Sequence, residues 1–207
     1  GAYKVRGAYY KISTMSSDER EKGLITASAG NHAQGVAYAA KLYGVPATIV
    51  MPTTTPLIKV NRTKGYGANV ILHGSVYDEA CQKALELAEK SGATFVHPFN
   101  DETVATGQGT IAMEIFKELP TVDIILVPIG GGGLAAGVST LAKLLNPNIK
   151  VIGVEPAGAS CMKASLDAGK VVTLPNVETI ADGTAVKTPG DKIFPYIQEN
   201  VDEIITV

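Results

Sequence analysis

The sequence has little cysteine and no excess of charge of either sign. Its two cysteines, Cys81 and Cys161, lie far apart without C-x-x-C spacing, which argues against a disulfide framework and a structural zinc site. We therefore expect a reducing, cytoplasmic setting. The formal net charge is −2 and no basic stripe is present, so nucleic acid is not an expected partner. No apolar run reaches the ~18 residues that a membrane span requires, so no membrane association is expected.

Short apolar runs alternate with helical patterns along the 207 residues. This alternation predicts an α/β fold with parallel strands and right-handed crossovers. In the first part, the expected strands are 24–28, 47–51, 69–72 and 94–97, and the expected helices are 33–43, 57–66 and 76–90. In the second part, the expected strands are 124–129 and 150–154, and the expected helices are 104–119, 134–145 and 160–168.

Two lobes follow from this pattern. Residues 23–99 are expected to form a small α/β lobe. Residues 1–22 and 100–207 are expected to form a larger lobe, with an N-terminal helix over 6–15 packed on its sheet. Ligands of such folds bind at the carboxyl ends of the strands.

Four consecutive glycines stand between the expected strand 124–129 and the expected helix that follows it. They are Gly130, Gly131, Gly132 and Gly133, and Leu134 comes next. A strand that turns through glycines into a helix aims unpaired N–H groups at one point, which suits a phosphate. A flexible linker is the alternative, but linkers seldom lie between an apolar strand and an alanine-rich helix. No dinucleotide or P-loop motif is present.

Two further segments could contribute to chemistry. Ser28, Ala29, Gly30, Asn31 and His32 follow the first strand of the small lobe and open a helix, so they offer a second anion site or an ordinary helix cap. Lys4 stands among tyrosine, valine and small residues. Burial there would lower its pKa and free the amine for Schiff-base chemistry, although most lysines are solvated surface charges.

Three motifs together resemble one family. A-Y-K-V-R-G-A at residues 2–8, S-A-G-N-H at 28–32 and G-G-G-G-L at 130–134 are similar, in order and spacing, to the fold type II pyridoxal-phosphate enzymes, specifically the threonine/serine dehydratases. The resemblance extends over essentially the whole chain. It implies a fold like that of the tryptophan synthase β subunit, with two open, mainly parallel twisted sheets flanked by helices. Compared with the family pattern, an N-terminal segment and a C-terminal part are lacking, so the large lobe is expected to be incomplete.

The resemblance also implies a role for each motif. Lys4 would bind pyridoxal 5′-phosphate covalently and remove the α-proton of the substrate, and Asn31 would bond the ring hydroxyl. The segment from Ser28 to His32 would bind the substrate carboxylate, and the glycine turn with Leu134 would hold the phosphate. Gly183 lies in a loop that borders the cofactor ring in the family, although Asp-Gly is also a common turn dipeptide.

The implied reaction is β-elimination of L-threonine, or L-serine, to 2-oxobutyrate, or pyruvate, and ammonia. Serine racemases resemble this chain but carry a serine at the position of Ala29, which has no proton to give, so elimination is favoured over racemisation. Racemase-like members also bind a divalent metal through residues that match Glu155 and Ala159. Cys161 replaces their third ligand, an aspartate, and we therefore expect no metal.

The expected partners are a small amino-acid substrate and further copies of the chain, in a dimer or tetramer. Isoleucine biosynthesis is among the roles that the resemblance implies. Two alternatives remain open: a non-catalytic α/β module that binds a phosphorylated ligand, and another fold type II enzyme, such as a serine racemase or a threonine synthase relative.

Overall fold

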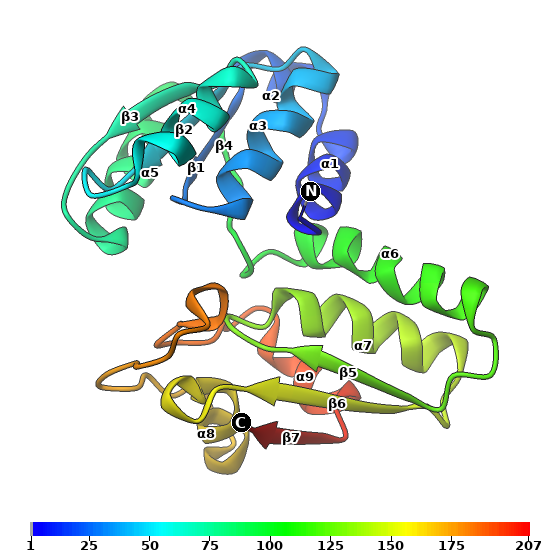
Figure 1. Ribbon diagram of the computed structural model, residues 1–207. Helices are drawn as coiled ribbons and strands as arrows, with labels where there is room; N and C mark the ends of the chain where they lie inside the picture. Colours follow the sequence, from blue (N-terminus) through cyan, green and yellow to red (C-terminus); the bar gives the residue numbers. More distant parts are fainter. Residues whose placement is uncertain (1) are drawn as a thin grey trace. The chain divides into compact units, whose positions relative to one another are not determined.

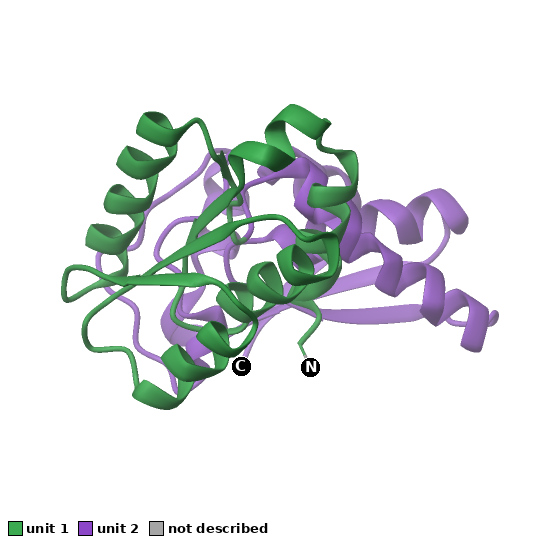
Figure 2. Ribbon diagram, turned by 90° about the horizontal axis from the view of Figure 1, so that it is seen from above, with its two compact units in different colours: residues 1–98 green, residues 99–207 purple. Residues whose placement is uncertain are grey.

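The computed structural model of the protein describes residues 2–207 (Figure 1). The chain divides into two compact units, residues 1–98 and residues 99–207, which Figure 2 shows in separate colours. Each unit contains one parallel sheet with its own helices. Within the described residues, no helix combines the length and the hydropathy that a membrane span needs.

The first unit is built on a four-stranded parallel sheet of order β3-β2-β1-β4. Its strands are β1 (Leu24–Ala27), β2 (Ala47–Met51), β3 (Asn69–Leu72) and β4 (Thr94–Phe95). Its helices are α1 (Lys4–Thr14), α2 (Ser17–Lys22), α3 (Asn31–Tyr43), α4 (Leu57–Gly65) and α5 (Tyr77–Ser91). Every residue of β1 is buried, as expected for a central parallel strand covered on both faces.

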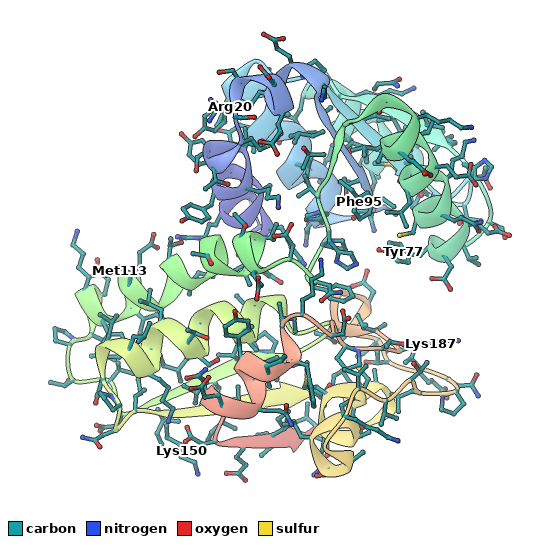
Figure 3. All side chains as sticks on the ribbon, turned by 180° about the vertical axis from the view of Figure 1, so that it is seen from behind. Arg20, Tyr77, Phe95, Met113, Lys150 and Lys187 are labelled. Carbon is teal, nitrogen blue, oxygen red and sulfur yellow. The ribbon has the colours of Figure 1, made fainter. Side chains whose placement is uncertain are left out.

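Helix α5 covers one face of β1. Ile25 and Ala27 of the strand form a small core with Ala80 and Ala84 of the helix, and Phe95 of β4, labelled in Figure 3, packs at its margin. Because successive strand residues point to opposite faces, Thr26 faces away from this core. Thr26 is buried as well, so both faces of β1 are covered where the strand leads into α3.

The second unit contains a three-stranded parallel sheet of order β5-β6-β7. Its strands are β5 (Ile124–Pro128), β6 (Lys150–Glu155) and β7 (Glu203–Thr206). Its α-helices are α6 (Glu102–Glu118), α7 (Gly133–Leu145), α8 (Cys161–Ala168) and α9 (Phe194–Asn200), and short 3₁₀ turns cover Ala157–Ala159 and Asp182–Thr184. Residues of β5, β6, α6, α7 and α9 share one core.

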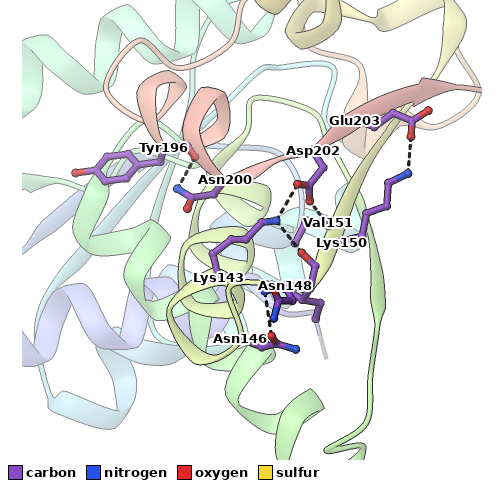
Figure 4. Close-up of polar contacts among 10 residues, drawn as sticks. Lys143, Asn146, Asn148, Lys150, Val151, Tyr196, Asn200, Asp202 and Glu203 are labelled. Carbon is purple, nitrogen blue, oxygen red and sulfur yellow. Dashed lines mark hydrogen bonds and ion pairs between the residues drawn. The ribbon is translucent and has the colours of Figure 1, made fainter.

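Edge strand β7 is tied to its neighbours by a polar cluster at its start (Figure 4). Asp202 accepts hydrogen bonds from the Lys143 Nζ atom at 2.8 Å and from the Val151 N–H at 2.7 Å. Lys143 also donates to the carbonyl oxygen of Ile149 at 2.7 Å. One carboxylate thus connects α7, β6 and the approach to β7.

The parallel α/β architecture predicted from the sequence is confirmed. Helix α1 packs against α3 within the first unit. A Cβ added to Gly35 of α3 would lie 3.0 Å from the Val5 nitrogen and 3.1 Å from the Lys4 carbonyl carbon, so the missing side chain of Gly35 eases this close approach. The assignment of residues 1–22, of which residue 1 lies outside the described residues, to the larger lobe of a complete fold stays a prediction.

Candidate active site

The glycine turn has no room for side chains. Added Cβ atoms on Gly131 and Gly133 would overlap Phe99, the latter at 2.8 Å from its backbone. Gly132 has φ +103°, and a Cβ there would lie 2.6 Å from the Met162 Cε atom. This conformation and this packing are both open only to glycine. The run of glycines is therefore required by the turn itself.

The same turn presents unpaired donors at the start of α7. Within residues 2–207, no protein acceptor bonds the N–H groups of Gly131, Gly132, Gly133 or Leu134. The Gly131 carbonyl oxygen, in contrast, accepts a hydrogen bond from the Gly190 N–H at 3.0 Å. Free N–H groups with a helix dipole behind them form an anion cradle, so these residues fit the phosphate of pyridoxal 5′-phosphate.

The loop that carries Gly183 lies against this turn. The Gly183 carbonyl oxygen would be 3.3 Å, and the Thr184 Cα 3.1 Å, from a Cβ added to Gly130. The structure thus brings Gly183 next to the glycine turn within the second unit. A Cβ added to Gly183 itself would meet no atom within 4 Å, so a ligand could approach its backbone.

Lys4 is the first residue of α1, and its side chain is partly buried. The Nζ atom donates to the Pro98 carbonyl oxygen at 2.6 Å and lies 5.5 Å from the centroid of the Tyr3 ring. Burial lowers the pKa of Lys4 to about 8, because the ammonium form loses hydration. A larger share of this side chain is therefore a free amine near neutral pH than for an ordinary lysine.

The segment from Ser28 to His32 joins β1 to α3. Ser28 Oγ accepts from the Gly30 N–H at 3.2 Å, Gly30 is the N-cap, and Asn31 is exposed in the first turn. The Nε2 atom of the buried His32 lies 2.9 Å from the Val96 carbonyl oxygen, which also accepts from Thr26 Oγ1 at 2.7 Å. Because a carbonyl can only accept, Nε2 carries the proton. His32 thus lies in the first turn of α3, and its ring binds the residue that follows β4.

Some contributors were not predicted from the sequence. Phe99 packs under the glycine turn, and the carbonyl groups of Val96 and Pro98 hold His32 and Lys4. Every residue has a backbone carbonyl group, so the sequence does not show which carbonyl groups will bind side chains. Thr26 is the one polar residue of the buried strand β1, and its hydroxyl group indicated that a hydrogen-bond acceptor lies beside that strand.

Glu155, which matches a metal-binding position in the racemase-like members, has structural partners here, and Ala159 lies in the 3₁₀ turn that follows. Both carboxylate oxygens of Glu155 accept N–H groups of α8, and the Ala159 N–H donates to the Pro156 carbonyl oxygen at 2.9 Å. Burial raises the pKa of Glu155, while the N–H groups of Lys163 and Met162 oppose that shift. Among residues 2–207, no group of three or more His, Cys, Asp or Glu side chains is placed to hold a metal ion.

Comparisons with known proteins agree with this geometry. The family described as "Pyridoxal-phosphate dependent enzyme" matches residues 1–207. The chain is 52% identical over 207 residues to an L-threonine ammonia-lyase of Thermotoga maritima, covering 100% of the chain and 52% of that relative. It is 50% identical over 206 residues to the L-threonine dehydratase biosynthetic IlvA of Escherichia coli, covering 100% of the chain and 40% of that relative. The chain thus spans about half or less of the length of these curated relatives.

Two solved structures are closely similar. The processed form of threonine deaminase isoform 2 from Solanum lycopersicum has a TM-score of 0.97 at 50% identity, covering 100% of this chain and 60% of that one. Maize serine racemase has a TM-score of 0.96 at 41% identity, covering 100% of this chain and 63% of that one. The fold is therefore shared by a deaminase and a racemase.

Proposed function

The chain belongs to the pyridoxal-phosphate dependent enzymes, and on that premise we propose that it deaminates L-threonine and L-serine by β-elimination, in which water leaves first and is taken up again when ammonia is released. The products are 2-oxobutyrate and pyruvate, respectively, with ammonia. The observation that carries the proposal is the partly buried Lys4 amine, which bonds the Pro98 carbonyl oxygen and has a lowered pKa, at the start of a helix that packs on α3. Bound pyridoxal phosphate supplies the electron sink for this chemistry.

Each part of the chain then has a task. The Lys4 amine would hold the cofactor aldehyde and would take the α-proton of the substrate. Asn31 would bond the ring hydroxyl, and the segment from Ser28 to His32 would bind the substrate carboxylate. The N–H groups of the glycine turn and Leu134 hold the phosphate, and Gly183 borders the ring. General acid–base help of this kind is typically worth about 10²- to 10⁴-fold in rate.

Reductive labelling tests the assignment of Lys4. The protein is incubated with pyridoxal phosphate, reduced with borohydride and digested, and the labelled peptide is identified by mass spectrometry. We expect the label on Lys4 and its loss in Lys4→Ala. Lys41→Ala, which removes an exposed lysine of α3, is the matched control and should label normally. Label scattered over surface lysines would favour the non-catalytic phosphate-binding module.

Product analysis tests the reaction. Threonine alone should yield 2-oxobutyrate, without a second substrate, and Lys4→Ala should abolish turnover. A requirement for a second substrate would point to another fold type II activity.

The likeness to maize serine racemase makes racemisation the second candidate. A racemase needs a proton donor on the opposite face of the substrate, and the methyl side chain of Ala29 cannot supply one. We therefore expect little D-serine beside pyruvate when L-serine is the substrate. Formation of D-serine at rates near those of elimination would contradict the proposed specificity.

Assembly and location complete the proposal: a homo-oligomer, dimer or tetramer, that works in the cytoplasm, with a role in isoleucine biosynthesis. The names of the biosynthetic IlvA relatives support the metabolic role. Light scattering at several protein concentrations measures the oligomeric state, and a monomer throughout would contradict the proposed assembly.

A further inference from the structure

Glu155 is a fully buried carboxylate at the end of β6. Its Oε1 atom accepts the Met162 N–H at 2.9 Å, and its Oε2 atom accepts the Lys163 N–H at 2.9 Å. These are among the N–H groups that the first turn of α8 leaves without helical partners. Ser160 is the N-cap residue, but its side chain does not cap the helix. The carboxylate of Glu155 therefore performs the capping from seven residues upstream.

The turn that Glu155 caps lies directly against the glycine turn. The Cys161 Sγ atom is 3.9 Å from the Gly130 carbonyl oxygen, and a Cβ added to Gly132 would lie 2.6 Å from the Met162 Cε atom. Residues at the start of α8 thus contact two of the four glycines. A shift of this helix end would move the backbone whose N–H groups are free for an anion.

We propose that Glu155 is a positioning residue for the phosphate-binding turn, which it acts on through the first turn of α8. The inference rests on the proposed function, because it presumes that the glycine turn holds the cofactor phosphate. It gives Glu155 a role different from that of its counterparts in racemase-like members, which bind a divalent metal. In this chain the third metal-binding position is Cys161, and its thiol lies against the glycine turn instead.

The experiment compares two aldehydes that differ only in the phosphate. Pyridoxal phosphate and pyridoxal are titrated into the full chain in EDTA, and binding at the Lys4 amine is followed by absorbance. The preference for the phosphorylated aldehyde measures the quality of the phosphate site. In Glu155→Gln one carboxylate oxygen becomes an N–H₂ group that cannot accept from the backbone. We expect this preference to fall by up to about tenfold, because the first turn of α8 loses a charge-assisted hydrogen bond whose free energy sets the upper limit of the effect, while the affinity for pyridoxal is unchanged.

Ser165→Ala is the matched control. Ser165 is equally buried in α8, and its hydroxyl bonds the Cys161 carbonyl oxygen and the Val172 N–H, so its loss weakens the helix without removing the cap. The melting temperature should fall and the preference for the phosphate should stay that of the wild type. Glu155→Asp, whose shorter carboxylate keeps the charge, is the milder variant to use if the glutamine variant does not fold, and it should show a smaller loss of the same preference.

The possible results separate the inference from the proposed function. An unchanged preference in both Glu155 variants would overturn the inference. A loss that appears only with magnesium and vanishes in EDTA would overturn it too, because Glu155 would then be a metal ligand. Equal affinity of the wild type for the two aldehydes would instead remove the phosphate site and the proposed function with it.

Discussion

At the scale of single residues, the burial of Lys4 has a consequence for its reactivity. Only the free amine reacts with an aldehyde or an acylating reagent, and burial lowers the pKa of Lys4 to about 8. Its reaction rate in the cofactor-free protein should therefore rise through a midpoint near pH 8, well below the value of about 10.4 of an ordinary lysine. Pulse labelling at several pH values with peptide mapping measures this midpoint. A midpoint above pH 10 would show that the amine is solvated.

The glycine turn gives a second prediction at this scale. Gly131→Ala would force a methyl group into the Phe99 ring. Overpacking of this kind costs about 1–3 kcal/mol of unfolding free energy. Gly183→Ala, where the methyl group meets no atom within 4 Å, is the control and should cost far less. Thermal unfolding of the cofactor-free variants measures the difference, and equal melting temperatures would contradict this packing.

The local structure around a single residue was predictable where that residue type is unusual for its position in the sequence. Four glycines between an apolar strand and a helix indicate a turn with free N–H groups, and that turn is present. The assigned roles of Lys4, Asn31 and the Ser28 segment stay predictions. The contacts of Lys4 with Pro98 and of Gly131 with Phe99 join positions far apart in the sequence. They depend on packing that no local pattern reports.

At the scale of elements, helices α6 and α7 meet through glycine. A Cβ on Gly137 would overlap the Ala105 carbonyl oxygen, and one on Gly109 would lie 2.8 Å from the Gly137 carbonyl oxygen. Gly137→Ala should therefore push the helices apart and destabilise the second unit by about 1–3 kcal/mol. Met113→Ala, which shortens a half-exposed side chain of α6 labelled in Figure 3, is the control with little expected effect. Urea denaturation measures both.

The start of α6 carries its own cap. Asp101 Oδ1 accepts the Val104 N–H at 3.1 Å. Asp101→Ala should reduce stability by about 0.5–2 kcal/mol, whereas Asp101→Asn keeps an acceptor and should reduce it less. Equal losses in the two variants would show that the cap bond is not the cause.

The periodic elements were predictable and the others were not. The expected helices 57–66, 76–90 and 104–119 agree with α4, α5 and α6 within two residues at either end. Helix α2 was missed because its sequence, SDEREK, has no apolar residue to set a period, and it depends on a capping box between Ser16 and Glu19. The last expected strand of the first lobe, 94–97, is a strand only over Thr94–Phe95, and the carbonyl group of Val96 just beyond it bonds the side chains of Thr26 and His32.

At the scale of the whole molecule, stability is linked to acid through Asp202. Partial burial raises the pKa of this carboxyl, but the hydrogen bonds from Lys143 and the Val151 N–H outweigh it and hold the pKa below its usual value. A depressed folded-state pKa means that the stabilisation is present above the unfolded value of about 3.9 and is lost as pH falls through the folded value.

Asp202→Asn should therefore destabilise at neutral pH, by roughly 1 kcal/mol after allowance for solvent screening, and the difference should shrink in acid. Glu203→Gln removes a partner of Lys150 in a pair about half exposed on both sides, at 48% and 50%, and should change stability little. Denaturation curves from pH 7 to pH 3 measure both variants. A difference that grows in acid would contradict the sign of this linkage.

The two sheets of the molecule were predictable. Alternating strands and helices predicted two parallel sheets, and the structure confirms both. The assignment of residues 23–99 to one lobe and of residues 1–22 and 100–207 to the other stays a prediction. The contact of α1 with α3 was not predicted, because it involves Gly35, whose missing side chain matters only once the two helices are packed together.

The hydrogen bond between Lys4 Nζ and the Pro98 carbonyl oxygen fixes where the amine stands without consuming its reactivity. A neutral amine that donates one N–H keeps its lone pair, so the nitrogen is held in place and is still open to an aldehyde. Such preorganisation lowers the entropic cost of coupling, because the reacting nitrogen is already restricted to one position.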